Sequence, residues 1–220
     1  HFNYKLSKEI HEIKVFGFGS VHVEDEDKKE IVDKCIFEYG FYGFKLHPYV
    51  QGFSPTDERL FSVYERLEEL GKTINIHTGF DDYYPKKEKP ITLSGIEGLI
   101  KKFPSLTFIL PHMFYPRLEE ALYLLETYNN VYIDTTNIYS AIIQDEQKGM
   151  NRDKLREILI NTIKKWYKRI VFGSDYPCGM SDLDTIYSDF YSFGLDEKIK
   201  REIMFNTPYS LIIKGNKAPA

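Results

Sequence analysis

Short apolar segments alternate with amphipathic segments along most of the chain. Six of the apolar segments have the length and the β-branched or aromatic bias of strands, and they cover residues 15–22, 41–46, 73–77, 106–110, 131–134 and 170–172. Apolar residues recur at helical spacing over residues 25–39, 54–70, 93–103, 116–128, 155–167, 183–193 and 197–213. Strands that alternate with helices pair in parallel through right-handed crossovers, so this pattern predicts an α/β fold.

Glycine and proline mark where several of these helices begin and end. Gly40 and Gly71 follow two of the helical segments, where a glycine commonly closes a helix. Ser54 is the predicted N-cap of the helix that ends at Gly71, with Pro55 in its first position. The sequence therefore predicts compact strand–helix units joined by short connections.

Both a TIM-type (β/α) barrel and an open, doubly wound sheet fit such units. An open sheet concentrates its ligands near one switch point, whereas here polar residues follow many different strands, so we favour the barrel. No GxGxxG or GxxxxGK[ST] turn follows any strand, which argues against nucleotide binding through a glycine-rich loop. With 220 residues, of which 42% are hydrophobic, the chain is expected to form a single domain over residues 1–220.

Charge and cysteine content limit the classes of partner and the compartment. The chain has 29 basic and 33 acidic residues, and they are interspersed, so we expect a small-molecule partner rather than nucleic acid or a membrane surface. Cys35 and Cys178 belong to no CxxC pair, which favours a reducing setting. No apolar run approaches the roughly 18 residues of a membrane span, and no signal peptide is recognisable, so the expected location is the cytoplasm.

Three of the predicted strands are followed by a side chain that can bind a metal ion. These side chains are His77, His112 and Asp175. In a barrel, the carboxyl ends of the strands form the face that holds the active site, while the opposite face serves stability. We therefore expect the two imidazoles and the carboxylate to converge at one rim.

Six short motifs in the chain make it resemble the amidohydrolase superfamily, in particular the branch of metal-dependent hydrolases that includes decarboxylases of the aminocarboxymuconate-semialdehyde and resorcylate type. The motifs occur in the family's order and together extend over most of the chain. They are Gly17–His22, Gly43–Pro48, Ile76–Gly79, Leu110–Met113, Asn130–Thr135 and Phe172–Pro177.

The resemblance implies a divalent metal cofactor, most often Zn²⁺. It makes His77 a metal ligand, Asp175 a ligand that also takes the proton of a metal-bound water, and His112 an acid/base or polarising group. Imidazole and carboxylate suit zinc, and zinc lowers the pKa of a bound water to about 7, which gives a nucleophile at neutral pH.

The family's first strand, with its His-x-His pair, and its usual second strand have no counterpart before residue 15. The expected fold is thus a barrel that lacks its first one or two strands; a fragment, a shortened relative and a form that lost these segments all fit. His1 is a candidate for the second histidine of the pair, and so a further candidate metal ligand. Exposed strand edges are templates for association, so a homo-oligomer is one expectation.

Residues near other strand ends are candidates for binding substrate. Lys45 and His47 come at the end of the segment 41–46, where Lys45 could bind a substrate carboxylate, and Gln51 and Tyr176 lie in loops after strands. Each is also an ordinary strand-end or loop residue.

Three functions remain open from the sequence. The first is hydrolysis of a small ester, lactone or amide through a metal-activated water. The second is metal-dependent, non-oxidative decarboxylation of a small unsaturated or aromatic acid. The third is a non-catalytic relative with an incomplete metal site, since the His-x-His pair is missing.

Overall fold

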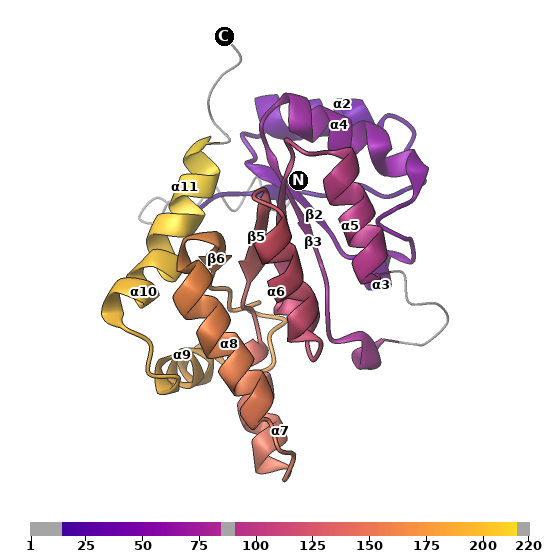
Figure 1. Ribbon diagram of the computed structural model, residues 1–220. Coiled ribbons are helices and arrows are strands. Elements are labelled where there is room, and N and C mark those ends of the chain that lie inside the picture. The colour runs from indigo at the N-terminus through magenta and orange to yellow at the C-terminus, as the bar shows by residue number, and fades with distance from the viewer. Residues whose placement is uncertain (1–14, 85–90, 215–220) are drawn as a thin grey trace. The chain divides into compact units, whose positions relative to one another are not determined.

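The computed structural model describes residues 15–84 and 91–214 (Figure 1). These residues fall into two compact units. Among the described residues, the first unit takes in 15–77, 91–109 and 210–214, and the second takes in 78–84 and 110–209. The expectation of a single domain over residues 1–220 stays a prediction.

The first unit is built on parallel strands that pair in sequence order. Gly43 of β2 pairs with Phe18 of β1 and with Thr73 of β3, and Thr73 pairs in turn with Thr107 of β4. Its strands are β1 (Phe18–Gly19), β2 (Gly43–Leu46), β3 (Thr73–Ile76) and the first part of β4 (Thr107–Pro111). Its α-helices are α2 (Lys28–Asp33), α3 (Pro48–Gln51), α4 (Phe61–Glu69) and α5 (Leu93–Lys102).

The core of this unit lies between the strands and the apolar faces of α4 and α5. Figure 1 shows α2 and α4 side by side, and the two helices pack on each other. The helix α4 buries Val63, Tyr64 and Leu67, and the phenol of Tyr64 donates a hydrogen bond to the carbonyl of Pro55 at 2.7 Å. Burial of these apolar side chains holds the helices against the strands.

The second unit carries the remaining strands and most of the C-terminal helices. Ile133 of β5 (Val131–Asp134) pairs in parallel with Ile170 of β6 (Ile170–Val171). Its helices are α6 (Leu118–Thr127), α7 (Ile138–Gln147), α8 (Asp153–Trp166), α9 (Leu183–Ser192), α10 (Glu197–Arg201) and α11 (Thr207–Lys214), of which α11 ends in the first unit. The helices α6 and α8 lie against each other, as do α7 and α9.

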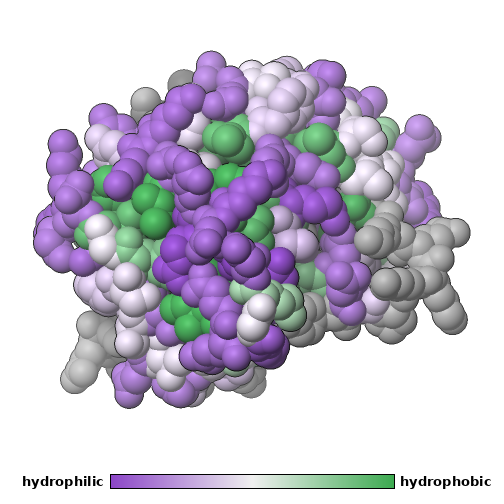
Figure 2. Space-filling model, turned by 60° about the horizontal axis from the view of Figure 1, so that its bottom comes forward, coloured by the Kyte–Doolittle hydropathy of each residue, from purple (hydrophilic) through white to green (hydrophobic). Residues whose placement is uncertain are grey.

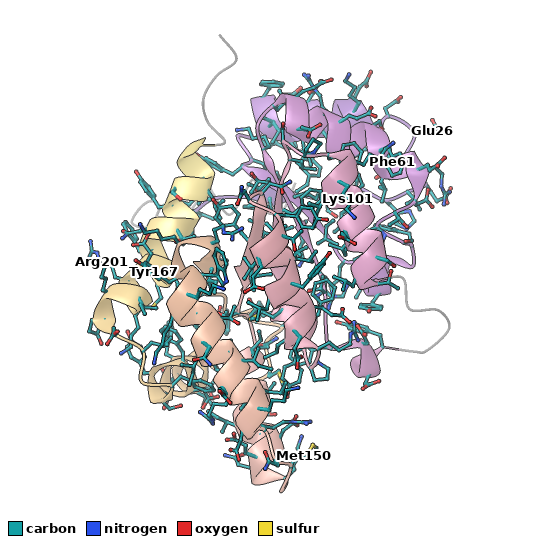
Figure 3. The ribbon with its side chains drawn as sticks, in the orientation of Figure 1. Glu26, Phe61, Lys101, Met150, Tyr167 and Arg201 are labelled. Carbon is teal, nitrogen blue, oxygen red and sulfur yellow. The ribbon has the colours of Figure 1, made fainter. Side chains whose placement is uncertain are left out.

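The end of α8 is tied firmly into the second unit. Figure 3 labels Met150, which precedes α8, and Tyr167, which follows it. Trp166 is the last residue of α8 and the single tryptophan of the chain. The guanidinium of Arg169 lies 4.4 Å from the centre of the Trp166 ring and donates hydrogen bonds to the carbonyls of Tyr128 and Leu125.

The predicted α/β fold with six parallel strands is confirmed, and the differences concern where elements begin and end. The strand expected over residues 15–22 is limited to Phe18–Gly19, because the backbone N–H of His22 turns to bond the Asp25 carboxylate at 2.7 Å. The predicted N-cap at Ser54 is wrong. Residues 54–56 form a turn, and Asp57 caps the helical segment by accepting from the N–H of Arg59 at 3.0 Å. The helix α7 was not predicted.

The surface carries hydrophilic side chains with apolar patches between them, as the face in Figure 2 shows. Within the described ranges, no helix is both long enough and apolar enough to cross a membrane.

Candidate functional site

His77 comes directly after β3 in the first unit, and only 5% of it is exposed. The ring of His47, which follows β2, stacks on it with the ring centres 3.8 Å apart and the planes 17° from parallel. The ring of Tyr49 meets His77 edge-on at 5.9 Å. Two aromatic neighbours therefore fix the plane of the His77 imidazole.

His47 is held neutral at physiological pH. Burial, and then the positive charge of Lys45, lower its pKa to about 4. Its Nδ1 faces the backbone N–H of Val50 at 3.4 Å at the start of α3. Because the ring is uncharged, stacking against His77 involves no repulsion between cations.

Lys45 and Gln51 make hydrogen bonds within the first unit. The ammonium of Lys45 donates to Asn75 Oδ1 at 2.8 Å. The side-chain amide of Gln51 donates to the carbonyl of Val21 at 2.9 Å and accepts from the N–H of His47 at 2.7 Å. Gln51 thus ties the segment after β1 to the start of α3. A substrate role for Lys45 or Gln51 stays a prediction.

His112 lies in the second unit, directly after β4, and only 3% of it is exposed. Its Nδ1 is 2.9 Å from the backbone carbonyl of Thr136. A carbonyl only accepts, so Nδ1 carries the hydrogen and Nε2 is the basic nitrogen of the neutral ring. Phe80 packs edge-on against the imidazole at 5.2 Å.

Asp175 follows β6 in the same unit. The side-chain amide of Asn137 donates to Asp175 Oδ2 at 3.1 Å. Burial, and then the charge of Asp175, raise the pKa of the Tyr84 hydroxyl, so Tyr84 is a neutral phenol in the field of this carboxylate. Tyr176, predicted to bind substrate, is 63% exposed.

Both of these predicted catalytic residues have left-handed backbone. The φ angle is +66° at His112 and +58° at Asp175, and it is +46° at Met113 and +55° at Phe114. Left-handed backbone is tolerated by Asp and His but is unusual for side chains as large as Met and Phe. Such conformations persist where the surrounding structure imposes them, and they concentrate at functional sites.

The turn that carries His112 is held by Thr78 and Gly79. The hydroxyl of Thr78 donates to the carbonyl of Pro111 and accepts from the N–H of Phe114 at 3.3 Å. A Cβ atom on Gly79, where φ is +76°, would lie 2.5 Å from the nitrogen of Tyr115. This glycine is therefore required for the close approach of the two backbones.

The turn after β5 is held by Asp134. Its Oδ1 accepts from both the N–H and the hydroxyl of Thr136, at 2.8 and 2.5 Å. A Cβ atom on Gly173 would lie only 2.0 Å from the Thr136 hydroxyl oxygen. Asp134 therefore holds the turn, and Gly173 leaves room for it.

Sequence reasoning missed Thr136 and Asn137 as neighbours of the predicted site residues, and it selected His47 without its stacking on His77. The available signal was the run of three polar residues, Thr135–Asn137, directly after the strand Val131–Asp134. His1 lies outside the described residues.

The donor types present suit a divalent metal, but they form an incomplete set. His77 offers an imidazole and Asp175 a carboxylate, which are common zinc ligands. Across residues 15–84 and 91–214, no group of three or more His, Cys, Asp or Glu side chains is arranged to hold a metal ion. His77 of the first unit and Asp175 of the second are thus metal ligands by chemical type, and their joint role in a metal centre stays a prediction.

Comparison with known proteins gives matches over nearly the whole chain. A family model described as amidohydrolase matches residues 9–211. The protein fluG of Emericella nidulans is 32% identical over 103 residues, which is 46% of this chain and 11% of that protein. The chain thus spans only about a tenth of the length of this curated relative.

Solved structures of low sequence identity share the fold. An uncharacterized TIM-barrel protein from Bordetella bronchiseptica has a TM-score of 0.70 at 18% identity, covering 98% of this chain and 72% of that one. A putative 2-pyrone-4,6-dicarboxylic acid hydrolase from Pseudomonas putida has a TM-score of 0.66 at 15% identity. The match covers 97% of this chain and 77% of that one. A dihydroxybenzoic acid decarboxylase from Polaromonas, solved with manganese and 2-nitroresorcinol, has a TM-score of 0.66 at 17% identity, covering 99% and 74%.

Proposed function

Because the chain belongs to the amidohydrolase family, we propose that it is a metal-dependent enzyme that hydrolyses a small ester, lactone or amide. The observation that carries the proposal is the left-handed backbone at Met113 and Phe114, large side chains in which it is unusual, directly after His112, a residue that sequence reasoning had already selected as catalytic. Strain of this kind is maintained against an energetic cost, and it marks functional positions more often than ordinary surface turns.

In this proposal, His77 and Asp175 are metal ligands, and His1 is a further candidate. A divalent metal, when bound, supplies positive charge that polarises a substrate oxygen and favours ionised water. The stacked His47 ring and the edge of Tyr49 fix the direction in which the His77 imidazole points. That orientation is what a ligand needs, because a rotated ring would misdirect its lone pair.

Asp175 and His112 handle the protons in this proposal. Asp175 takes a proton from the attacking water as general base. As the water oxygen bonds to the carbonyl carbon and the bond to the leaving oxygen or nitrogen breaks, Asp175 returns this proton to the leaving group. His112 donates from Nδ1 to the Thr136 carbonyl, and with a proton on Nε2 from solvent before the reaction the ring would stabilise negative charge on the substrate. Lys45, His47, Gln51 and Tyr176 are the proposed substrate-binding residues.

A non-oxidative decarboxylation of a small unsaturated or aromatic acid is the second candidate. The likeness to the Polaromonas decarboxylase supports it, as does the ammonium of Lys45, which could pair with a substrate carboxylate. Release of carbon dioxide without uptake of labelled oxygen from water would favour this reaction over hydrolysis.

A non-catalytic relative is the third candidate. It is supported by the absence, among the described residues, of a group of three potential metal ligands. Metal analysis after supplementation with zinc or manganese separates it from the two enzymes. About one equivalent of metal supports an enzyme, and none favours the non-catalytic relative.

The test of the proposed function compares wild-type protein with Asp175→Asn. Asparagine tolerates left-handed backbone, so this variant should fold while losing the charge and the basic oxygen. Suitable probes are p-nitrophenyl acetate, 2-pyrone-4,6-dicarboxylate and 2,6-dihydroxybenzoate, each assayed with added zinc or manganese. We expect bound metal to fall and turnover to drop by about 100-fold or more. Wild-type turnover and metal content in Asp175→Asn would refute the assignment.

A further inference from the structure

The side chain of Asn137 bonds two partners from one loop that lies about 40 positions later in the second unit. It follows β5, has left-handed backbone with φ of +64°, and is 8% exposed. Its Nδ2 donates to Asp175 Oδ2 at 3.1 Å, and its Oδ1 accepts from the N–H of Met180 at 3.2 Å. One short side chain therefore links the end of β5 to both Asp175 and the loop that follows it.

The chemistry at this position selects asparagine. The backbone needs a residue that tolerates a positive φ, which favours Gly, Asn and Asp. The partners need a donor toward the Asp175 carboxylate and an acceptor toward the Met180 N–H. An amide offers both, a carboxylate offers acceptors alone, and glycine offers neither.

Thr136, the residue before Asn137, contacts the other predicted catalytic residue, His112. The carbonyl of Thr136 accepts from His112 Nδ1, so two consecutive residues of one turn contact His112 and Asp175. The turn itself is fixed by the bonds from Thr136 to Asp134. A displacement of this turn would move the supports of both groups together.

We propose that Asn137 is the positioning residue of Asp175, and that the Thr136–Asn137 turn sets His112 and Asp175 in a common frame. The proposal rests on the assignment of Asp175 and His112 made above. By holding Oδ2 from one side, the Asn137 amide fixes the plane of the carboxylate and hence the direction of Oδ1. Asn137 acts through Asp175 and is not itself a catalytic residue.

Two variants of Asn137 distinguish the positioning of Asp175 from the support of the loop that contains Met180. Asn137→Asp keeps an acceptor for the Met180 N–H and a residue that tolerates the backbone, but it loses the donor and places a negative charge beside Asp175. Asn137→Gly keeps the backbone and removes both bonds. Asn206→Asp is the matched control, because Asn206 Nδ2 also donates to a carboxylate, that of Glu202, at 3.0 Å.

Three measurements are made on the wild type and on each variant of the 220-residue chain. The first is the crystal structure around residue 175, and the second is the affinity for Co²⁺, followed by the visible absorption of the ion. The third is kcat and KM for whichever probe the wild type converts. We expect both Asn137 variants to show a turned Asp175 carboxylate and Co²⁺ affinity lowered by about 10–100-fold, as for other residues that orient a metal ligand. We expect kcat to fall more than KM rises, and Asn206→Asp to match the wild type.

Wild-type Co²⁺ affinity and kcat in Asn137→Asp, with loss in Asn137→Gly alone, would overturn the proposal, because the Met180 bond would then be the part that matters. If the wild type binds no Co²⁺ and converts no probe, the proposed function fails, and the crystal structures still decide the inference. An Asp175 carboxylate that keeps its direction in both Asn137 variants would overturn positioning. A turned carboxylate would support it.

Discussion

One hydrogen bond sets the tautomer of the neutral His112 ring. Because the Thr136 carbonyl holds the hydrogen on Nδ1, the neutral ring presents Nε2 as a base. The left-handed backbone at this position also restricts replacements to a few residue types.

We therefore expect His112→Asn to fold, because Asn tolerates the backbone, and to lose the basic nitrogen. Turnover of the converted probe should fall by about 10²–10⁴-fold, the usual contribution of a general acid or base. Steady-state kinetics, with thermal unfolding as the check on folding, measures this. Undiminished turnover in a folded variant would remove His112 from the reaction.

Asp57 is a residue whose contribution to stability depends on pH. Its carboxylate pairs with the Arg59 guanidinium and also accepts from the N–H of Arg59 at the start of the segment Glu58–Leu60, and these bonds, the first above all, lower its pKa to about 2. A lowered pKa means that the stabilisation is complete above the unfolded-state pKa of about 3.9 and is lost as the pH falls toward 2.

We expect Asp57→Ala to reduce the free energy of unfolding at pH 7 by about 1 kcal/mol, with most of this from the cap because the ion pair is exposed to water. Asp57→Asn should stay close to wild type at pH 7, because Asn is an equally good cap, and should lose the wild-type dependence on pH between about 4 and 2. Urea unfolding at several pH values measures both. Equal pH profiles for Asp57→Asn and wild type would contradict the prediction.

At the scale of elements, replacing two of the glycines by alanine should change stability in opposite directions. Gly173 after β6 leaves room for the Asp134–Thr136 turn, where a Cβ would lie 2.0 Å from the Thr136 hydroxyl. Gly98 lies inside α5, where a Cβ would have no described atom within 4 Å beyond its chain neighbours and the backbone of its own helix.

We predict that Gly173→Ala lowers the free energy of unfolding by about 1–3 kcal/mol through overpacking and also reduces turnover, because it displaces the turn that holds His112. Gly98→Ala should raise stability by about 0.5–1 kcal/mol, because alanine is the better residue inside a helix, and should leave turnover unchanged. Denaturant unfolding and probe kinetics on the two variants test this pair. A tolerated Gly173→Ala would mean that Thr136 can move without consequence.

The elements also show how far sequence reasoning reaches. Gly40 and Gly71 were expected to close helices, and both have positive φ, because local backbone preference decides such positions. The cap at Ser54 was placed wrongly because Asp57, three residues later, competes for the same role. Neither the His47–His77 stack nor the Asn137–Asp175 bond could be predicted. Each joins residues about 30 or more positions apart, and no local preference specifies such a pairing.

At the scale of the whole molecule, the strand-helix alternation predicted the α/β fold correctly, and the order of the motifs predicted the amidohydrolase family. Periodicity reports burial, so it identifies elements that cover a core. The identity of the substrate depends instead on loop side chains, which periodicity does not describe.

Trp166 makes it possible to observe the unfolding of one unit separately. It lies in the second unit, against Arg169, and no other tryptophan exists in the chain, so indole fluorescence observes that unit alone. Far-ultraviolet circular dichroism observes the helices of both units. A single domain should give superimposable melting curves from the two signals. An emission change that precedes or follows the ellipticity change would instead reveal two units that melt independently.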